Sequence, residues 1–474
     1  MYNFIKSLVI LRNVQEFFIS CRFHTYILNR NIPGAIYITG RSFLMLATLR
    51  QRNFALLWLG GLISLIGDWA LMVGLPIYVY LLTRSVLALS IALLVSSIPN
   101  IVLSSIAGVF VDRWDRKRTM VITNLLLALA LLPLLLARTA DRVWIIYLAA
   151  FVGTCIEQFF SPAQSALLPT LVREAHLVQA NSLNSLSSNL ARLVGPALGG
   201  LIAALFGLNG IVLVDAASFL IAGILVALIT ASSKPPVETK TPLPAAEAGA
   251  LAHLWHEWID GMRVIRSERT LSVLLTMFAI TMLGEGVFGV LYPVFVYQIL
   301  HGGALQIGQL MSAQAVGGLI GGVFVGWLGK RIMSRWAIGL FGMAFGITDL
   351  LIFNSPAFFP FFWLTVGLFV TAGLVGIGPA TGAQSLLQAK SPDAYRGRIF
   401  GALGMTMGLF ALIGTITAGF FTDHLGVVAV LNIQAAGYVF GGLLVLALLP
   451  REKDTVPLQT EPAPADLTSM QSES

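Results

Sequence analysis

The segment Gly108-Val-Phe-Val-Asp-Arg-Trp-Asp-Arg-Lys-Arg118 is a short charged stretch between two long apolar blocks, at about 88–111 and 119–137. As a helix at ~1.5 Å per residue, each block is long enough to cross a ~30 Å hydrocarbon core. Charged residues make up only 11% of the chain and hydrophobic residues 57%, whereas about 25% is charged in an ordinary soluble domain. Most of the surface is therefore expected to lie in lipid, where helices satisfy their own backbone groups.

The same pattern of apolar blocks recurs along the whole chain and predicts twelve membrane-spanning helices. The expected spans are 54–82, 88–111, 119–137, 143–167, 182–206, 211–230, 270–298, 305–328, 336–353, 358–387, 399–421 and 427–449. Strands are disfavoured because the blocks are apolar on all sides and do not alternate. The expected fold class is an all-α membrane protein.

A polar linker divides the chain into five expected regions. Residues 46–230 and 270–449 are expected to form two six-helix bundles. Residues 231–269 would be a cytoplasmic linker that begins rich in Pro, Lys and Glu and continues as an amphipathic surface helix. Residues 1–45 are interpreted as an extension or a wrongly assigned start, with an interfacial anchor helix as the alternative, and 450–474 as a disordered cytoplasmic tail.

Basic residues lie mainly on one side of the expected spans. The opposite side carries only Arg84, Arg138 and Arg142. Because basic residues are retained on the cytoplasmic side, both termini are expected in the cytoplasm and the chain in the inner or plasma membrane. This distribution also accounts for the net charge of +7 without nucleic acid as a partner.

Short segments of the first half recur in the second half. Gly108-Val-Phe-Val111 returns as Gly322-Val-Phe-Val325, and Gly207 has Gly426 as its counterpart. Held in order over six spans, these matches indicate a duplication. Because each repeat has an even number of spans, both halves enter from the same side, which predicts the parallel type of repeat with a substrate path between the halves.

The opening segment has a glycine, three residues, Asp-Arg and a basic cluster, and it resembles the loop signature of the major facilitator superfamily. The residues of this loop are Gly108, Asp112, Arg113, Arg116, Lys117 and Arg118, with Asp115 where the family has a second glycine. The glycine permits close helix approach, and Asp112 can accept from a neighbouring helix N-terminus. The basic residues are expected to pair with carboxylates and to anchor the loop at lipid headgroups.

The second-half copy of the loop is degenerate. Gly326 stands where Asp112 stood, and Lys330 and Arg331 keep the charge, while Arg396 and Arg398 follow the tenth span. The first-half loop is therefore expected to matter more for gating.

A narrower resemblance, from Leu49 to Leu449, is to the enterobactin-exporter and macrolide-efflux branch of that superfamily. It is carried by Ile66-Gly-Asp68-Trp, Thr83-Arg-Ser85, Glu157, Pro162-Ala163, Ala180-Asn-Ser182, Gly195-Pro196 and Arg396-Gly-Arg398. The resemblance implies proton-driven export of a lipophilic drug, macrolide or siderophore.

The Gly-Pro segment of span five is similar to the core of the antiporter signature. Its residues are Gly195, Pro196, Gly199 and Gly200, with Ala191 in place of the leading glycine. The alternative is a kinked packing helix with no bearing on transport direction. The arginine of the family's span-four motif is missing near Ala149–Gly153, which leaves the coupling scheme open.

Five ionisable residues fall inside the expected spans: Asp68, Glu157, Arg192, Asp215 and Glu285. A charge at mid-bilayer costs a few kcal/mol, so such residues generally face a cavity or a partner. Asp68 and Glu157 are predicted proton or cation sites, with Arg192 as partner to one of them, and Asp215 and Glu285 are further candidates for this coupling. Helix packing or a structural hydrogen bond is the alternative.

Further polar residues lie in the expected spans. Gln158, Gln314 and Gln384 are candidates for hydrogen bonds to a substrate, and no other substrate-binding residue is identified. Asp349, close to an outer span end, is expected to be solvated.

Two other functions remain open: a nutrient importer of the same fold and a non-transporting membrane scaffold or sensor. An enzyme is not expected, since neither a nucleophile elbow nor a metal-binding histidine pair is present. The lack of a phosphate-binding Gly-rich loop argues against ATP. The expected protein is a monomer without metal or cofactor, whose partners are the lipid bilayer, a small molecule and protons.

Overall fold

The computed structural model describes residues 48–111, 113–230 and 250–450, and these residues form helices and short connections without a strand. The helices are α3 (Arg52–Thr83), α4 (Val86–Val111), α5 (Arg116–Leu131), α6 (Val143–Leu171), α7 (Leu177–Ala227), α8 (Ala250–Ser267), α9 (Arg269–Gln298), α10 (Ala304–Leu328), α11 (Arg335–Phe358), α12 (Phe362–Lys390), α13 (Arg396–Leu425) and α14 (Val427–Leu448). The predicted extension at 1–45, the first part of the linker and the tail beyond Pro450 lie outside the described residues.

The described helices account for the twelve predicted spans. Ten of them are long and apolar enough to cross a membrane. One of the ten, α7, has 51 residues and breaks at Gly207, whose φ of 64° is outside helical geometry, so α7 contains two spans. The apolar helix α4, with 26 residues, supplies the twelfth. Gly426, the predicted counterpart of Gly207, also has a positive φ of 83°, a conformation that glycine adopts readily.

The end of the ninth span differs from the prediction. The expected span ends at 353, whereas α11 continues to Phe358. The helix continues because Asn354 Nδ2 donates to Asn432 Oδ1 of α14 at 2.7 Å. A polar side chain with a partner inside the bundle does not have to end a membrane helix.

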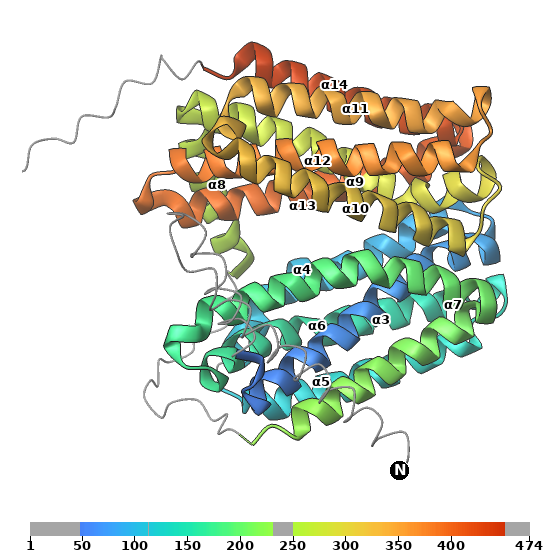
Figure 1. Cartoon of the computed structure of the whole chain (residues 1–474), viewed down its shortest axis with the longest axis vertical. Helices are drawn as coiled ribbons and strands as arrows, with labels where there is room; N and C mark the ends of the chain where they lie inside the picture. The colour runs from blue at the N-terminus through green and yellow to red at the C-terminus, as the bar shows by residue number, and fades with distance from the viewer. Residues whose placement is uncertain (1–47, 112, 231–249, 451–474) are drawn as a thin grey trace, which may run out of the picture.

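The helices lie in two groups, α3–α7 and α9–α14, which come together at one end of the molecule (Figure 1). Equivalent helices pair in each group: α3 packs on α7 as α9 packs on α13, and α4 packs on α6 as α10 packs on α12. The contacts between the groups are equivalent too, with α7 against α10 and α4 against α13. The structure is therefore two six-helix bundles with pseudo-symmetric packing, as the internal repeat predicted.

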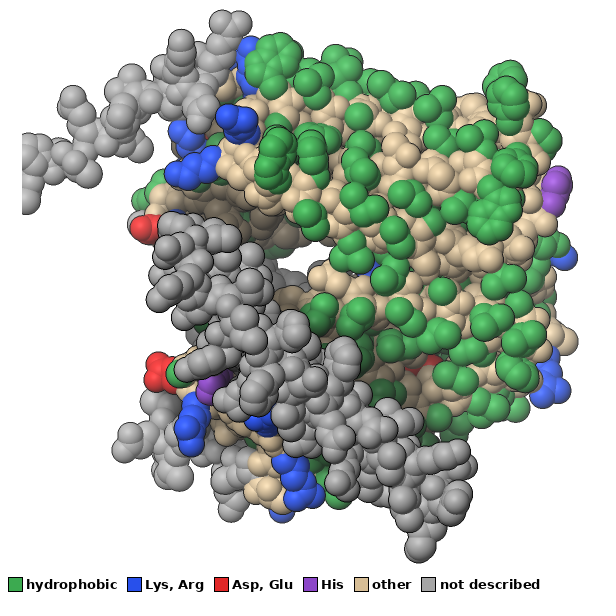
Figure 2. Space-filling model, viewed as in Figure 1, with side chains coloured by type: hydrophobic (Ala, Val, Ile, Leu, Met, Phe, Trp, Pro, Cys, Tyr) green, Lys and Arg blue, Asp and Glu red, His purple; other side chains and the backbone are tan. Residues whose placement is uncertain are grey.

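The surface is divided into an apolar middle and a basic end (Figure 2). The basic end carries the 113–118 and 330–335 loops. In the middle, large side chains point outward, and Ile433 and Phe440 of α14 are 62% and 59% exposed. Such a band of exposed apolar side chains belongs in lipid, so the protein is a multi-pass membrane protein.

The amphipathic helix predicted in the linker is α8, and it packs against α13. Trp258 Nε1 donates to Thr406 Oγ1 at 3.3 Å. Gly261 lies against the backbone of α13, because a Cβ at this position would be 2.4 Å from the carbonyl oxygen of Arg398. The linker is thus anchored to the second bundle through a contact that leaves no room for a side chain.

We expect Gly261→Ala to destabilise the protein by roughly 1–3 kcal/mol, the usual cost of overpacking. Gly401→Ala is the matched control, because its added methyl group meets open space while both variants gain similar helix propensity. Thermal unfolding of the purified protein should therefore show a lower midpoint for Gly261→Ala than for Gly401→Ala. Equal midpoints would contradict the close packing of α8 on α13.

Candidate functional site

The two ends of the molecule differ in how the bundles meet. At the basic end each bundle has its own apolar core, one around Phe54, Met120 and Leu167 and the other around Leu274, Ile338 and Ile399. At the opposite end a single core joins residues of both bundles, including Leu89, Val212, Phe295, Ile307 and Ala418. The path between the bundles is therefore closed at the opposite end, and the surface is hollowed toward the basic end (Figure 2).

The Gly-Pro segment of α7 first packs within its own bundle. A Cβ on Gly195 would lie 2.4 Å from Trp69 Cβ, and a Cβ on Gly199 would lie 2.4 Å from Ala70 Cα, both on α3. These two glycines bring the backbones of α3 and α7 into direct contact. The α3 residues next to Asp68 are thereby fixed against α7.

The same segment also closes the path between the bundles. A Cβ on Gly200 would lie 2.5 Å from the carbonyl oxygen of Ala304 on α10. In return, a Cβ on Gly308 of α10 would lie 2.1 Å from the carbonyl oxygen of Pro196. The signature in span five therefore packs on two helices, one in each bundle, and its link to transport direction stays a prediction.

A polar cluster that the sequence analysis did not identify lies at the closed end, between α3 and α9. Arg84 Nη1 donates to Tyr297 Oη at 2.7 Å, and its guanidinium lies 5.1 Å from the centre of the Tyr297 ring. Gln298 Nε2 donates to the hydroxyl of Tyr80. Arg84 can make its contact because it leaves α3 with a φ of 54°. We call these four residues the outer latch, after the orientation proposed below. The sequence pointed to Arg84 only through the segment Thr83-Arg-Ser85 and through its place on the side with few basic residues.

The loop that resembles the family signature is held to its own bundle by backbone contacts. Arg116 Nη1 donates to the carbonyl oxygen of Ala166 at 3.0 Å, and Lys117 Nζ donates to that of Ile229 at 2.6 Å. These carbonyls lie near the C-terminal ends of α6 and α7, where the helix dipole favours a cation. The expected pairing of Arg116 and Lys117 with carboxylates stays a prediction. Asp112 lies outside the described residues.

The remaining loop residues start or end helices. Gly108 lies in the last turns of α4, and Arg113 lies in the turn that follows. Asp115, which replaces the family's second glycine, accepts from the backbone N–H of Arg118 at 2.9 Å. Asp115 therefore caps the N-terminus of α5, a role that a glycine performs without a side-chain acceptor.

The second-half loops have different surroundings. Lys330 and Arg331 lie in a short 3-10 helix, Gly329–Met333, between α10 and α11. Arg396 begins α13 and pairs with Asp393, while the guanidinium of Arg398 lies 5.8 Å from the ring centre of Tyr395.

Three of the predicted acidic residues come together in the first bundle. Asp68 of α3 interacts electrostatically with Asp215 of α7 and, more weakly, with Glu157 of α6. Asp215 is fully buried, and its Oδ1 accepts from Ser218 Oγ at 3.2 Å. Its Oδ2 is buried without a hydrogen-bond partner among the described residues. Carboxyl groups from three helices of the first bundle are thus close enough for their charges to interact.

The predicted cation of this set is Arg192. It acts electrostatically on Glu285 of α9, across the interface. The predicted partnership of Arg192 with Asp68 or Glu157 stays a prediction.

A second polar site lies in the C-terminal bundle. Tyr438 Oη donates to Glu285 Oε1 at 3.4 Å, and Gln434 Nε2 donates to Asp349 Oδ2 at 3.3 Å. Asp349 is only 5% exposed, so the expectation that it is solvated is wrong. Its side chain points into the bundle toward α14, which a position near a span end did not reveal.

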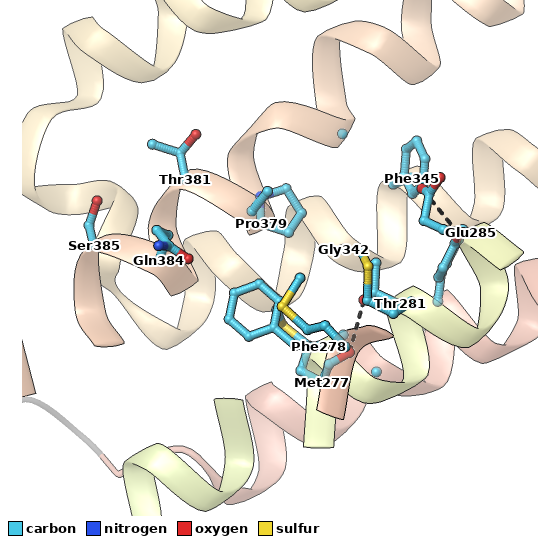
Figure 3. A pocket seen from close by; sticks show the side chains of 17 residues that line it. Met277, Phe278, Thr281, Glu285, Gly342, Phe345, Pro379, Thr381, Gln384 and Ser385 are labelled. Carbon is cyan, nitrogen blue, oxygen red and sulfur yellow. Dashed lines mark hydrogen bonds between the residues drawn. The ribbon is translucent and has the colours of Figure 1, made fainter. Parts of the chain in front are cut away.

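Next to this second site is a cavity of about 530 Å³. It lies among α9, α11, α12, α13 and α14, and Glu285 and Gln384 are among the residues that line it (Figure 3). The other two predicted glutamines lie elsewhere: Gln158 donates to Asn100 Oδ1 at 2.7 Å in the first bundle, and Gln314 is half-buried in α10. Only Gln384 therefore lines the cavity of the C-terminal bundle.

Two membrane bundles related by a repeat, with a path closed at one end and acidic groups buried on both sides, define a transporter that works by alternating access. The family model described as Major Facilitator Superfamily matches residues 57–380 and also 274–471. The chain belongs to this superfamily.

Relatives and solved structures agree with this assignment. Macrolide efflux protein A of Streptococcus pyogenes is 29% identical over 385 residues, which cover 79% of this chain and 90% of that protein. The multidrug efflux pump Tap of Mycolicibacterium fortuitum is 27% identical and covers 82% of this chain and 93% of its own. A bacterial homologue of the iron transporter ferroportin, solved in an inward-facing state, shares the fold with a TM-score of 0.66 at 18% identity, covering 84% of this chain and 98% of its own.

We expect Arg84→Gln to weaken closure at the latch end. Glutamine removes the charge and with it the charge-assisted hydrogen bond and the cation–π contact to Tyr297. Because exposed contacts of this kind are weak, we expect the ratio of closed to open states to fall by about two- to fivefold. Thr139 and Ala357 are exposed residues of the two bundles at this end. The distribution of distances between spin labels at Thr139→Cys and Ala357→Cys should then contain a longer component.

The labelling background carries Cys21→Ser and Cys155→Ser. Arg138→Gln is the control, because Arg138 lies at the same end and donates to the carbonyl oxygen of Leu135 in its own bundle. An unchanged distance distribution in Arg84→Gln would show that the latch does not hold this end closed.

Proposed function

We propose that this protein exports a lipophilic small molecule across the cell membrane in exchange for protons. The basic end is the cytoplasmic side, where both termini would lie, because basic loops are retained there. In this orientation the path opens to the cytoplasm, and a substrate enters it from the cytoplasm or the inner leaflet. The efflux function of the relatives supports export as the direction.

The observation that carries the proposal is the meeting of Asp68, Glu157 and Asp215 in the first bundle. Like charges that share a site with little water cannot all remain ionised, so a proton bound there is shared among them. A proton taken up from outside would neutralise the site in one state of the transporter. Its release to the cytoplasm would restore the charge and drive the return.

The bundles themselves would supply the movement. Arg116 and Lys117 tie the loop to α6 and α7, so the first bundle moves as one body. The contacts that must break for the outer end to open are the outer latch and the approach of Gly200 and Gly308. The energy comes from the ion gradient, with no ATP or cofactor.

We expect Asp68→Asn and Glu157→Gln to reduce proton-driven transport by about a hundredfold, the lower range for loss of a proton-transferring side chain. The measurement is accumulation of macrolides and other lipophilic drugs in inverted vesicles, with and without an imposed pH gradient. Asp141→Asn, a change at an exposed loop acid, should leave transport unchanged.

Normal expression with full proton dependence in both variants would show that these carboxyl groups do not couple transport. Accumulation that is the same with and without the pH gradient would exclude proton exchange as the driving reaction. Failure of every compound to move would favour a scaffold or sensor.

We expect single cysteines at Arg118 and Lys330 to react with a membrane-impermeant maleimide only from the cytoplasmic side. Cysteines at Thr139 and Ala357 should react from outside intact cells. All four positions are exposed, so access depends only on the side of the membrane. Labelling of the Arg118 and Lys330 positions from opposite sides would exclude the parallel arrangement of the bundles.

A further inference from the structure

We propose that the cavity inside the C-terminal bundle binds a lipophilic organic cation and that Glu285 is the counter-ion. The proposal rests on the export function proposed above and names the class of substrate that the protein carries. The size of the cavity, its lining, its charge and the aromatic rings at its acidic end support this assignment.

The size and lining suit a drug-sized apolar body. The cavity holds about 530 Å³, within the roughly 300–1,000 Å³ of small-molecule sites. Its apolar wall includes Met277, Phe278, Met282, Phe345 and Met407. Methionine side chains are flexible and polarisable, so such a wall can adapt to ligands of different shape.

The charge of the lining is one-sided. Among the described residues that line the cavity, Glu285 is the only carboxylate, and none is Lys, Arg or His. Its hydrogen bond to Tyr438 is 3.4 Å long, whereas strong bonds from a hydroxyl to a carboxylate are about 2.5–2.7 Å. The carboxylate therefore keeps capacity for a further partner, and an anion would be repelled.

Aromatic rings lie at the same end of the cavity. Figure 3 shows Phe345 beside Glu285, and the rings of Phe345 and Tyr438 are 5.1 Å apart and tilted by 37°. A cation near Glu285 could also lie against the face of one of these rings, and cation–π contacts of this kind favour alkylated ammonium groups. Thr381, Gln384 and Ser385 lie toward the other end (Figure 3) and offer hydrogen bonds to polar groups of the ligand.

Two charged groups nearby bear on the binding of a cation. Asp349 interacts electrostatically with Glu285. Arg192 of the first bundle is attracted to Glu285 across the interface. A bound cation would compete with Arg192 for one carboxylate and so weaken an attraction between the bundles. Binding of the substrate would thereby be coupled to their separation.

The test uses tetraphenylphosphonium and tetraphenylborate, two ions of nearly the same shape and opposite charge. Binding of each to the purified full-length protein in detergent is measured by equilibrium dialysis, with empty micelles as the blank. We expect saturable binding of the cation with an affinity at least about tenfold above that of the anion. Equal binding of the two ions would overturn the proposal.

Variants locate the site. Glu285→Gln should lower affinity for the cation by about tenfold and abolish the preference for it, while Glu174→Gln, at an exposed loop position, should change neither. Phe345→Leu should weaken binding several-fold. Thermal unfolding shows whether each variant folds, and Phe345→Leu keeps the proposal testable if Glu285→Gln does not fold. A folded Glu285→Gln or Phe345→Leu variant with wild-type binding of the cation would overturn the assignment.

A transport assay separates this proposal from the export function. In proteoliposomes, proton-driven movement of a neutral lipophilic compound together with equal binding of the two ions would overturn the cation site and leave export intact. Selective binding of the cation without proton-driven movement of any compound would overturn export and leave the site.

Discussion

A peptide group in hydrocarbon has no water to bond, so each span must satisfy its own backbone, and helices are the result. This constraint shapes the rest of the molecule. Every described crossing of the apolar band is helical. Many of the polar side chains in it bond to carbonyls of their own helix, as Thr123 does, and some to another helix, as Asn354 does to Asn432. Because a charge in this medium is costly, the carboxyl groups kept there mark places where the helices surround something other than lipid.

Helices in lipid gain little from hydrophobic burial against one another and depend on close packing. The glycines of α7 provide that packing in two directions: Gly199 places α7 against α3, and Gly200 places it against α10. The first contact makes the bundle rigid, while the second must be undone when the path opens at the far end. A short stretch of one helix therefore contributes both to a permanent core and to a contact that forms and breaks.

The two bundles share their topology but not their chemistry. Asp68 and Glu285 are equivalent, since each lies sixteen residues beyond the first residue of its helix, Arg52 or Arg269. Asp215 lies eight residues after Gly207, as Gln434 lies eight after Gly426. The first bundle surrounds its acids with other acids, whereas the second surrounds Glu285 with aromatic rings and a cavity. From one ancestral pattern the duplication has produced two different surroundings for an acidic residue inside the membrane: other acids in the first bundle, and aromatic rings beside a cavity in the second.

The sequence by itself determined the spans, the repeat, the family loop and the positions of Asp68, Glu157, Asp215 and Glu285, because hydropathy, glycine placement and charge are local properties that can be read one helix at a time. It missed the burial of Asp349, the outer latch around Arg84 and the partners of Arg116 and Lys117. Those features, and the cavity, depend on how each helix is rotated about its axis and how it crosses its neighbours. Rotation and crossing are set by packing between segments far apart in the chain, so only the tertiary structure decided them.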